Sequence, residues 1–116
     1  MRRHIVFNMH STLRLMQHSL RLTLFTHDRC SLCDSVKGVM SKVWDRRHFE
    51  YKEVDILAPE NKQWMSLYEL EIPVVHVDRT AMLASSNGET TAAARKLKHR
   101  FAAGELEKVM DEVERS

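Results

Sequence analysis

The sequence predicts an α/β domain with a four-stranded mixed sheet and three helices, in the order β-α-β-α-β-β-α. Three observations lead to this prediction. An apolar run at residues 20–26 precedes a segment with helical periodicity, residues 49–56 alternate apolar and polar side chains, and residues 103–114 form an amphipathic segment. The first crossover predicts a parallel pair of strands and the last two strands a hairpin. Two helices should then cover one face of the sheet and one helix the other.

The first half of the domain has the clearest periodicity. The strand over residues 20–26 alternates only weakly, as expected for a strand that is buried on both faces. A helix follows over about residues 31–44. Its apolar face consists of Val36, Val39, Met40, Val43 and Trp44. The second helix is expected to begin at Pro59, a residue suited to a first helical turn. Its apolar stripe consists of Trp64, Leu67 and Tyr68.

The second half of the domain is less regular. We expect a strand from Val74 to Val77, because Pro73 lacks an N–H and can start a strand but not occupy its middle. The composition of residues 89–98 suits a helix, whereas alternation over residues 96–101 favours a strand. Propensity leaves these two alternatives open.

Length and composition limit the classes of function. A chain of 116 residues holds one domain, and 43% hydrophobic with 29% charged residues is ordinary for a globular protein. The net charge of +2, with basic residues spread along the chain, does not indicate a nucleic-acid-binding protein. No apolar stretch reaches the roughly 20 residues that a membrane-spanning helix needs. We expect a monomer without nucleic-acid or membrane partners.

The N-terminal segment differs in charge from the rest of the chain. The first 27 residues contain no Asp or Glu and carry several Arg and His residues, and Asp28 is the first acid. A basic, acid-free leader of this kind is typical of a mitochondrial presequence. We predict a basic extension over residues 1–19 that directs the protein to mitochondria, and one domain over residues 20–116. The alternative is a cytoplasmic protein with a basic tail.

The two cysteines form one Cys-x-x-Cys motif, Cys30 to Cys33, between the first strand and the first helix. This placement favours a redox role over a structural one. At a helix N-terminus, unpaired N–H groups and the helix dipole stabilise a thiolate, the reactive form of cysteine. Arg29 adds positive charge and should lower the pKa of the Cys30 thiol further. Two cysteines in one motif also fit a reducing compartment, where disulfides are transient and catalytic.

Several segments around this motif make the chain resemble a glutaredoxin, most closely the small glutaredoxin-like proteins of unassigned function in fungi and animals. These segments are residues 22–26, 30–34, 55–56, 72–76 and 98–100. The resemblance covers about residues 20–114 and implies a thioredoxin-like fold. It also favours a strand at about residues 97–101, after an elongated hairpin loop at residues 79–93.

The resemblance implies a function and its residues. Cys30 would be the nucleophile and Cys33 the resolving cysteine of a thiol–disulfide oxidoreductase that acts in electron transport through a reversible intramolecular disulfide. Pro73 would be the family's cis-proline, and the N–H and carbonyl groups of the preceding Ile72 would bind an extended thiol substrate. The implied partners are glutathione, or the thiols and disulfides of other proteins.

The chain departs from typical glutaredoxins where those bind glutathione. His27 stands where they carry a lysine, and Glu71 replaces a threonine beside the proline. Their Gly-Gly-x-x-Asp segment before the last helix is absent, and residues 97–101 take its place. Glutathione carries two carboxylates and needs donors, which His27, Arg29 and Arg100 are candidates to supply.

These departures motivate an alternative from a different class, a non-catalytic adaptor domain that binds a metal or an iron–sulfur cluster. Thiolates suit zinc and iron–sulfur clusters, and a metal site needs three or four ligands. Cys30, Cys33, His27 and His76 would be the ligands. Our expectation is that no metal binds, and that His76 is an ordinary strand histidine with hydrogen-bond partners.

Overall fold

The computed structural model describes residues 18–116, so nearly all of the predicted N-terminal extension lies outside the described residues. The strands and main helices follow the predicted order. They are β1 (Leu20–Thr26), α2 (Ser31–Arg46), β2 (Glu50–Asp55), α3 (Lys62–Tyr68), β3 (Val74–Arg79), β4 (Arg95–Lys98) and α4 (Ala103–Arg115). Two short 3-10 helices, η2 (Pro59–Asn61) and η3 (Thr80–Ser86), precede α3 and follow β3.

The four strands form one mixed sheet in the order β2-β1-β3-β4. β1 runs parallel to β2 and antiparallel to β3, and β4 pairs antiparallel with β3. Phe25 near the end of β1 lies opposite Val74 at the start of β3, and Val74 lies opposite Lys98 at the end of β4. β2 and β4 are therefore the edges of the sheet, and the predicted parallel pair and hairpin are both confirmed.

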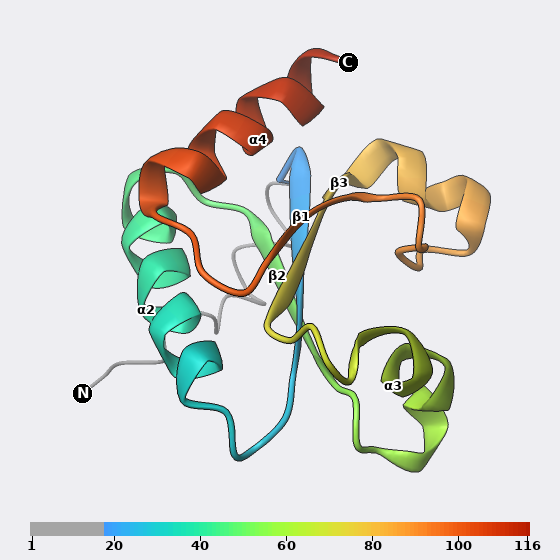
Figure 1. Cartoon of the computed structure of the whole chain (residues 1–116). Coiled ribbons are helices and arrows are strands. Elements are labelled where there is room, and N and C mark those ends of the chain that lie inside the picture. Colours follow the sequence, from blue (N-terminus) through green and yellow to red (C-terminus); the bar gives the residue numbers. More distant parts are fainter. Residues whose placement is uncertain (1–17) are drawn as a thin grey trace.

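The helices form a layer on each face of the sheet, with α2 and α4 on one side and α3 on the other (Figure 1). Alternation along β1 sends Leu22 and Leu24 toward α2 and α4, and Phe25 toward α3. The main core is filled from the two helices by Val36, Met40, Val43, Leu106, Met110 and Val113. The smaller core under α3 consists of Phe25, Ile56, Tyr68 and Val74. The predicted arrangement of two helices against one is confirmed.

The connection between β3 and β4 is tied to the sheet. η3 begins it, and the turn after η3 uses Asn87 and Gly88 with φ angles of 57° and 77°, a region that favours Gly and Asn. The Arg21 guanidinium of β1 donates to the Gly88 carbonyl at 2.6 Å and also pairs with Glu50 at 3.2 Å. The predicted long loop is therefore an ordered connection anchored on the central strand.

Two boundaries differ from the prediction, since Pro59 begins the 3-10 helix η2 and α3 starts only at Lys62, and β3 extends to Arg79. Two further predictions needed correction. In the late segment the strand is right and the helix wrong, but the strand spans Arg95–Lys98 because His99 takes a positive φ of 62° and leaves the ladder. In α3 the predicted stripe is partly wrong, since the Leu67 side chain is 48% exposed while Tyr68 is buried. α3 has only seven residues, so it buries a narrower face than a longer helix would.

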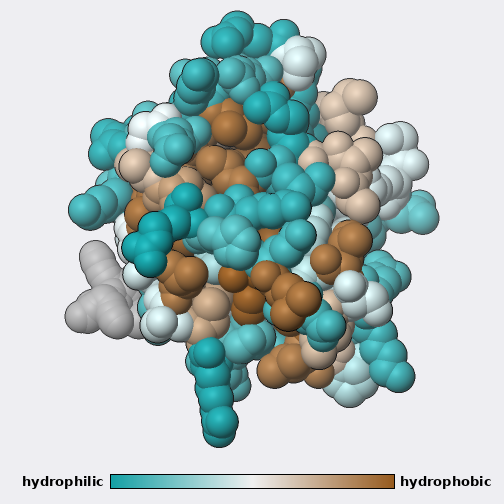
Figure 2. All heavy atoms as spheres, in the orientation of Figure 1, coloured by the Kyte–Doolittle hydropathy of each residue, from teal (hydrophilic) through white to brown (hydrophobic). Residues whose placement is uncertain are grey.

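The surface mixes polar and apolar side chains. Figure 2 shows apolar patches on the viewed face that hydrophilic side chains interrupt. Among the described residues, the large apolar side chains that remain exposed are Leu57, Leu67, Leu70 and Met82. Within residues 18–116, no helix is long and apolar enough to cross a membrane.

Candidate functional site

The sheet topology gathers three loops at one end of the domain. Because Phe25 pairs with Val74, the loop that follows β1 lies at the same end as the segment that precedes β3. Because Val74 pairs with Lys98, the residues after β4 lie at that end too. The predicted site residues lie on these three loops, which carry His27 to Cys30, Ile72 and Pro73, and Arg100, and in the first turn of α2, which carries Cys33.

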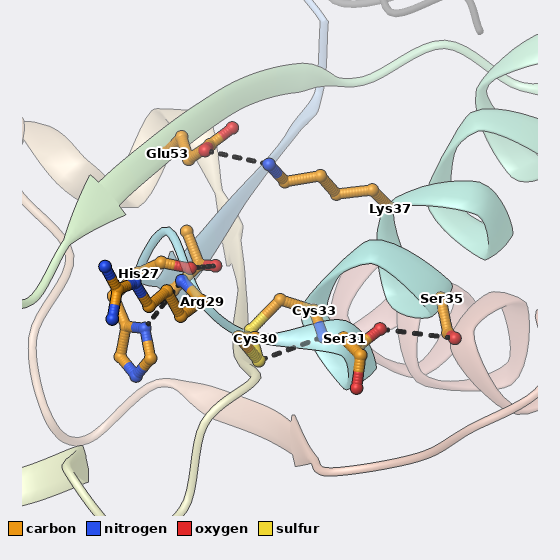
Figure 3. The surroundings of a disulfide bond; sticks show 9 residues. His27, Arg29, Cys30, Ser31, Cys33, Ser35, Lys37 and Glu53 are labelled. Carbon is orange, nitrogen blue, oxygen red and sulfur yellow. Dashed lines mark hydrogen bonds and ion pairs between the residues drawn. A yellow bond between two sulfur atoms is a disulfide. The ribbon is translucent and has the colours of Figure 1, made fainter. Parts of the chain in front are cut away.

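The two cysteines occupy the N-terminus of α2 and are joined by a disulfide (Figure 3). Their Cα atoms are 5.2 Å apart, a usual separation for a disulfide. Cys30 caps the helix, and its Sγ accepts a hydrogen bond of 3.1 Å from the Cys33 N–H. Cys33 lies in the first turn of α2 and is only 1% exposed, whereas Cys30 is partly exposed. The two sulfur atoms therefore differ in their access to a partner.

The start of α2 is fixed by contacts within the helix and to β2. The Asp34 N–H donates to the Cys30 carbonyl at 3.3 Å, which closes the first helical turn. Further along α2, Lys37 pairs with Glu53 of β2 at 3.2 Å (Figure 3). In the reduced protein the Cys33 N–H would point at the Cys30 sulfur, where it would stabilise a thiolate.

His27 and Arg29 lie on the loop before Cys30. The Arg29 N–H donates to the His27 Nδ1 at 3.3 Å, and both side chains point away from the disulfide (Figure 3). Arg29 is exposed. The structure thus brings both residues to the correct end of the sheet, but it shows them as flanking groups and not as direct partners of the sulfur atoms.

The segment before β3 forms a second wall of this end. The Ile72–Pro73 bond is cis, as the resemblance implies. The Pro73 carbonyl accepts from the His99 N–H at 2.8 Å, which holds the chain after β4 against the proline. Glu71 forms an ion pair of 2.7 Å with Lys98. The negative charge expected beside the proline is therefore offset by a lysine from β4.

Arg100 is exposed between β4 and α4. It lines a shallow pocket of about 320 Å³ together with Phe101, Ala102 and Glu105. The Glu105 carboxylate accepts a hydrogen bond of 2.8 Å from the Ala102 N–H at the start of α4. The pocket thus combines the guanidinium of Arg100 with a carboxylate that already serves the helix terminus.

A buried polar network lies on the α3 face of the sheet and was not anticipated from the sequence. His76 is fully buried, and both its ring nitrogens have partners, as expected; these are the hydroxyls of Tyr68 and Thr90. Thr90 also bonds to Asp78. The one signal in the sequence was the spacing of His76 and Asp78, which places both side chains on one face of the same strand. Thr90 could not be predicted as a partner, because it lies in a connection whose path does not follow from the sequence.

The candidate metal ligands Cys30, Cys33, His27 and His76 do not form a metal-binding group. Across the described part of the chain, no group of three or more His, Cys, Asp or Glu side chains is arranged to hold a metal ion. His76 uses both ring nitrogens in hydrogen bonds on the α3 face.

Comparison with known families identifies this arrangement. Residues 21–111 match the family described as Glutaredoxin-like domain (DUF836), which includes both cysteines, Pro73 and the polar network. The chain belongs to this family. A relative from Dictyostelium discoideum, the "Glutaredoxin-like protein YDR286C homolog", is 29% identical over 65 residues, covering 53% of this chain. The match spans 60% of that relative's length.

Solved structures with a similar fold include thioredoxins and a thioredoxin-like protein. Thioredoxin-2 of the malaria parasite superposes with a TM-score of 0.60 at 15% identity, covering 84% of this chain and 85% of that one. An uncharacterised thioredoxin-like protein from Clostridium perfringens gives 0.61 at 13%, covering 87% and 76%. A mutant thioredoxin from Halobacterium salinarum gives 0.58 at 15%, covering 85% and 78%. At these identities the comparison establishes the thioredoxin-like fold.

Proposed function

We propose that this glutaredoxin-like protein is a thiol–disulfide oxidoreductase in which Cys30 is the nucleophile and Cys33 the resolving cysteine. The observation that carries the proposal is the asymmetry of the pair at the start of α2. Cys30 is partly exposed and accepts a hydrogen bond from a helix-terminal N–H, whereas Cys33 is buried one turn further on. Accessible low-pKa thiolates are the cysteines that attack disulfides.

The reaction transfers two electrons from the dithiol to a substrate disulfide. The Cys30 thiolate attacks one substrate sulfur, forms a mixed disulfide and releases the other sulfur as a thiolate, which takes up a proton. Cys33 then loses its proton, attacks the Cys30 Sγ, and displaces the second substrate thiol. The protein is left with the Cys30–Cys33 disulfide that the structure contains. Two equivalents of a low-molecular-weight thiol would restore the dithiol by the reverse exchange.

Glutathione is our proposed reductant. Lys98, His99 and Arg100 follow one another beside Pro73, because the Pro73 carbonyl bonds to the His99 N–H. The ion pair with Lys98 offsets the charge of Glu71, which would otherwise repel an anionic tripeptide. Arg100 is the candidate group for one glutathione carboxylate, since guanidinium groups bind carboxylates well.

The test is a redox titration of the full-length protein against glutathione and its disulfide, read by alkylation and intact mass. The wild type should form a reversible intramolecular disulfide, with a midpoint near the ~−200 to −230 mV of glutaredoxins. Cys33→Ser should accumulate one glutathione on Cys30, and Cys30→Ser should accumulate none. Ser35→Ala, an exposed change on the same helix, is the control. A wild type that stays reduced throughout, or full reductase activity of Cys30→Ser, would contradict the proposal.

We also propose that residues 1–19 direct the protein to mitochondria and that it acts as a monomer. The support for targeting is the basic, acid-free composition of this segment. Residues 20–26, although also acid-free, form the buried strand β1, so the lack of acids there follows from burial. Light scattering of the purified protein tests the oligomeric state.

A further inference from the structure

A chain of side-chain hydrogen bonds crosses the sheet face that α3 covers. The His76 ring on β3 is fully buried. Its Nε2 lies 2.6 Å from the hydroxyl of Tyr68, the last residue of α3. Its Nδ1 lies 2.8 Å from the hydroxyl of Thr90, in the connection between η3 and β4. The Thr90 hydroxyl in turn donates to Asp78 at 2.6 Å.

The direction of each hydrogen bond in this chain follows from counting protons. Thr90 has one hydroxyl hydrogen and gives it to Asp78, so it must accept from the His76 Nδ1–H. The His76 Nε2 is then the acceptor, and the Tyr68 hydroxyl donates to it. Burial lowers the pKa of His76 to about 4 and raises the pKa of Tyr68. At neutral pH the imidazole is therefore neutral and the phenol protonated, as this direction requires.

Tyr68 connects this chain to the segment before Pro73. Its backbone carbonyl accepts from the Glu71 N–H at 2.8 Å and from the Ile72 N–H at 3.2 Å. Its side chain bonds to His76, three residues after the proline. Tyr68 therefore forms hydrogen bonds with the polypeptide on both sides of Pro73. Its ring also packs against Phe25, with centroids 5.1 Å apart, which limits its movement.

We infer that Tyr68 and His76 are positioning residues for the Ile72–Pro73 segment, and that Thr90 fixes the His76 tautomer on which the Tyr68 bond depends. The inference rests on the proposed function, because it assumes that a disulfide substrate lies along this segment. The role of the connection between β3 and β4 is then to place the Thr90 hydroxyl, which orients the His76 ring. Hydrogen bonds at the second nitrogen commonly select histidine tautomers in this way.

The Ile72 N–H is the backbone group that a shift of Tyr68 would affect most directly. The Tyr68 carbonyl serves two donors, and the Ile72 bond is the longer of the two. A substrate that pairs with Ile72 would take over this N–H, while the shorter Glu71 bond keeps the turn closed. If Tyr68 shifted, the Ile72 N–H would lose the carbonyl that fixes its direction before a peptide-like disulfide takes it over.

The experiment uses the full chain and compares two reagents for the reduced protein. Oxidised glutathione is a peptide disulfide that would contact Ile72, whereas iodoacetamide reacts with Cys30 and needs no contact with Ile72. Tyr68→Phe and Thr90→Val should each slow oxidation by oxidised glutathione about 3- to 10-fold, the loss expected for one hydrogen bond. Alkylation by iodoacetamide should stay within about twofold of wild type, because the cysteines are untouched.

Two further readouts separate positioning from general stability. Thr90→Ser keeps the hydroxyl and should retain the wild-type rate. The ¹⁵N chemical shifts of the His76 ring should show a protonated Nδ1 in the wild type and in Thr90→Ser, and a loss of this preference in Thr90→Val. Thr90 lies in a surface connection, so its variants remain usable even if Tyr68→Phe does not fold.

Each outcome decides the inference. Wild-type oxidation rates in cooperatively folded Thr90→Val, or an equal loss of alkylation, would overturn it. So would a His76 tautomer that Thr90→Val leaves unchanged. A wild type that exchanges with no disulfide at all would instead contradict the proposed function, and the ring shifts would still show whether Thr90 sets the tautomer.

Discussion

The Glu71 carboxylate lies 2.7 Å from the Lys98 ammonium, across the gap between the residues before Pro73 and the end of β4. The two side chains are 39% and 38% exposed, so the pair contributes little to stability and acts mainly through its charges. It neutralises the one acidic residue next to the proline. The reaction of the dithiol with charged disulfides should therefore depend on this pair.

We predict that Lys98→Gln slows oxidation of the reduced protein by oxidised glutathione a few-fold, because Glu71 is then unpaired and repels the anion. Glu71→Gln should accelerate the same reaction. The neutral 2-hydroxyethyl disulfide should react with all three proteins at similar rates. The effect should shrink at high salt, where the Debye length falls to about 3 Å at 1 M. Lys52→Gln, which breaks an exposed ion pair between β2 and Glu89 of the connection before β4, is the charge-matched control.

A second prediction concerns the pH dependence of stability. His76 has a pKa of about 4 in the folded protein and about 6.5 when unfolded. Between these values the unfolded chain binds a proton that the folded protein does not, so the free energy of unfolding should fall as the pH is lowered. From pH 7.5 to pH 5 the loss is about 2 kcal/mol. Lys96 contributes in the same direction, through its charge on the buried ring.

Urea unfolding at several pH values measures this loss. His18 contributes with the same sign, because burial and then His48 lower its pKa, so the comparison is between the wild type and His76→Gln. The variant should lose most of the pH dependence in this range. His99→Asn, an exposed change that tolerates the positive φ at this position, should keep it. Parallel pH profiles for wild type and His76→Gln would argue against the buried neutral imidazole.

A third prediction tests the two cores. Leu106 of α4 is fully buried between α4 and the sheet, so Leu106→Ala should lower the free energy of unfolding by about 2–5 kcal/mol. Leu67 on α3 is half-exposed, so Leu67→Ala should cost less than about 1 kcal/mol. Urea unfolding of the two variants checks the difference. Equal losses would mean that the Leu67 side chain is buried in solution, in contrast to the structure.

The proposed targeting segment gives a fourth prediction. A fusion of residues 1–19 to a fluorescent reporter should accumulate in mitochondria, because the segment is basic and free of acids. A matched fusion in which Arg2, Arg3 and Arg14 are replaced by Glu should remain in the cytosol. A diffuse signal from the unaltered fusion would remove the mitochondrial assignment.

The order of the elements and the layering of the helices followed from periodicity in the sequence. Strict alternation marked β2, helical spacing marked α2 and α4, and the Cys-x-x-Cys motif fell at the predicted strand-to-helix junction. These features are local, so a single sequence carries them. The same holds for the start of β3, which Pro73 fixes by lacking an N–H.

The remaining features depend on contacts between distant residues. β4 ends at Lys98 because His99 turns to bond with Pro73, and no local propensity encodes that bond. The pairing of Glu71 with Lys98 depends on the register between β3 and β4. The Thr90 hydroxyl that bonds to His76 comes from a connection whose sequence is mostly small and polar. None of these three features could be predicted from the sequence, for the same reason. Several local conformations were acceptable in each segment, and tertiary packing determined which one is adopted.

The two edge strands affect whether another polypeptide can add a strand to this sheet. β2 presents Lys52 and Glu53, and β4 presents Arg95 and Lys98, in strands of only six and four residues. Short strands with charged side chains are poor templates for the addition of another strand. A peptide is thus discouraged from extending the sheet sideways, and a peptide substrate of the proposed reaction would be directed to the segment beside the proline. Under the proposed function, the domain would bind an extended polypeptide briefly at the end of the sheet that carries the cysteines, without forming a larger aggregate.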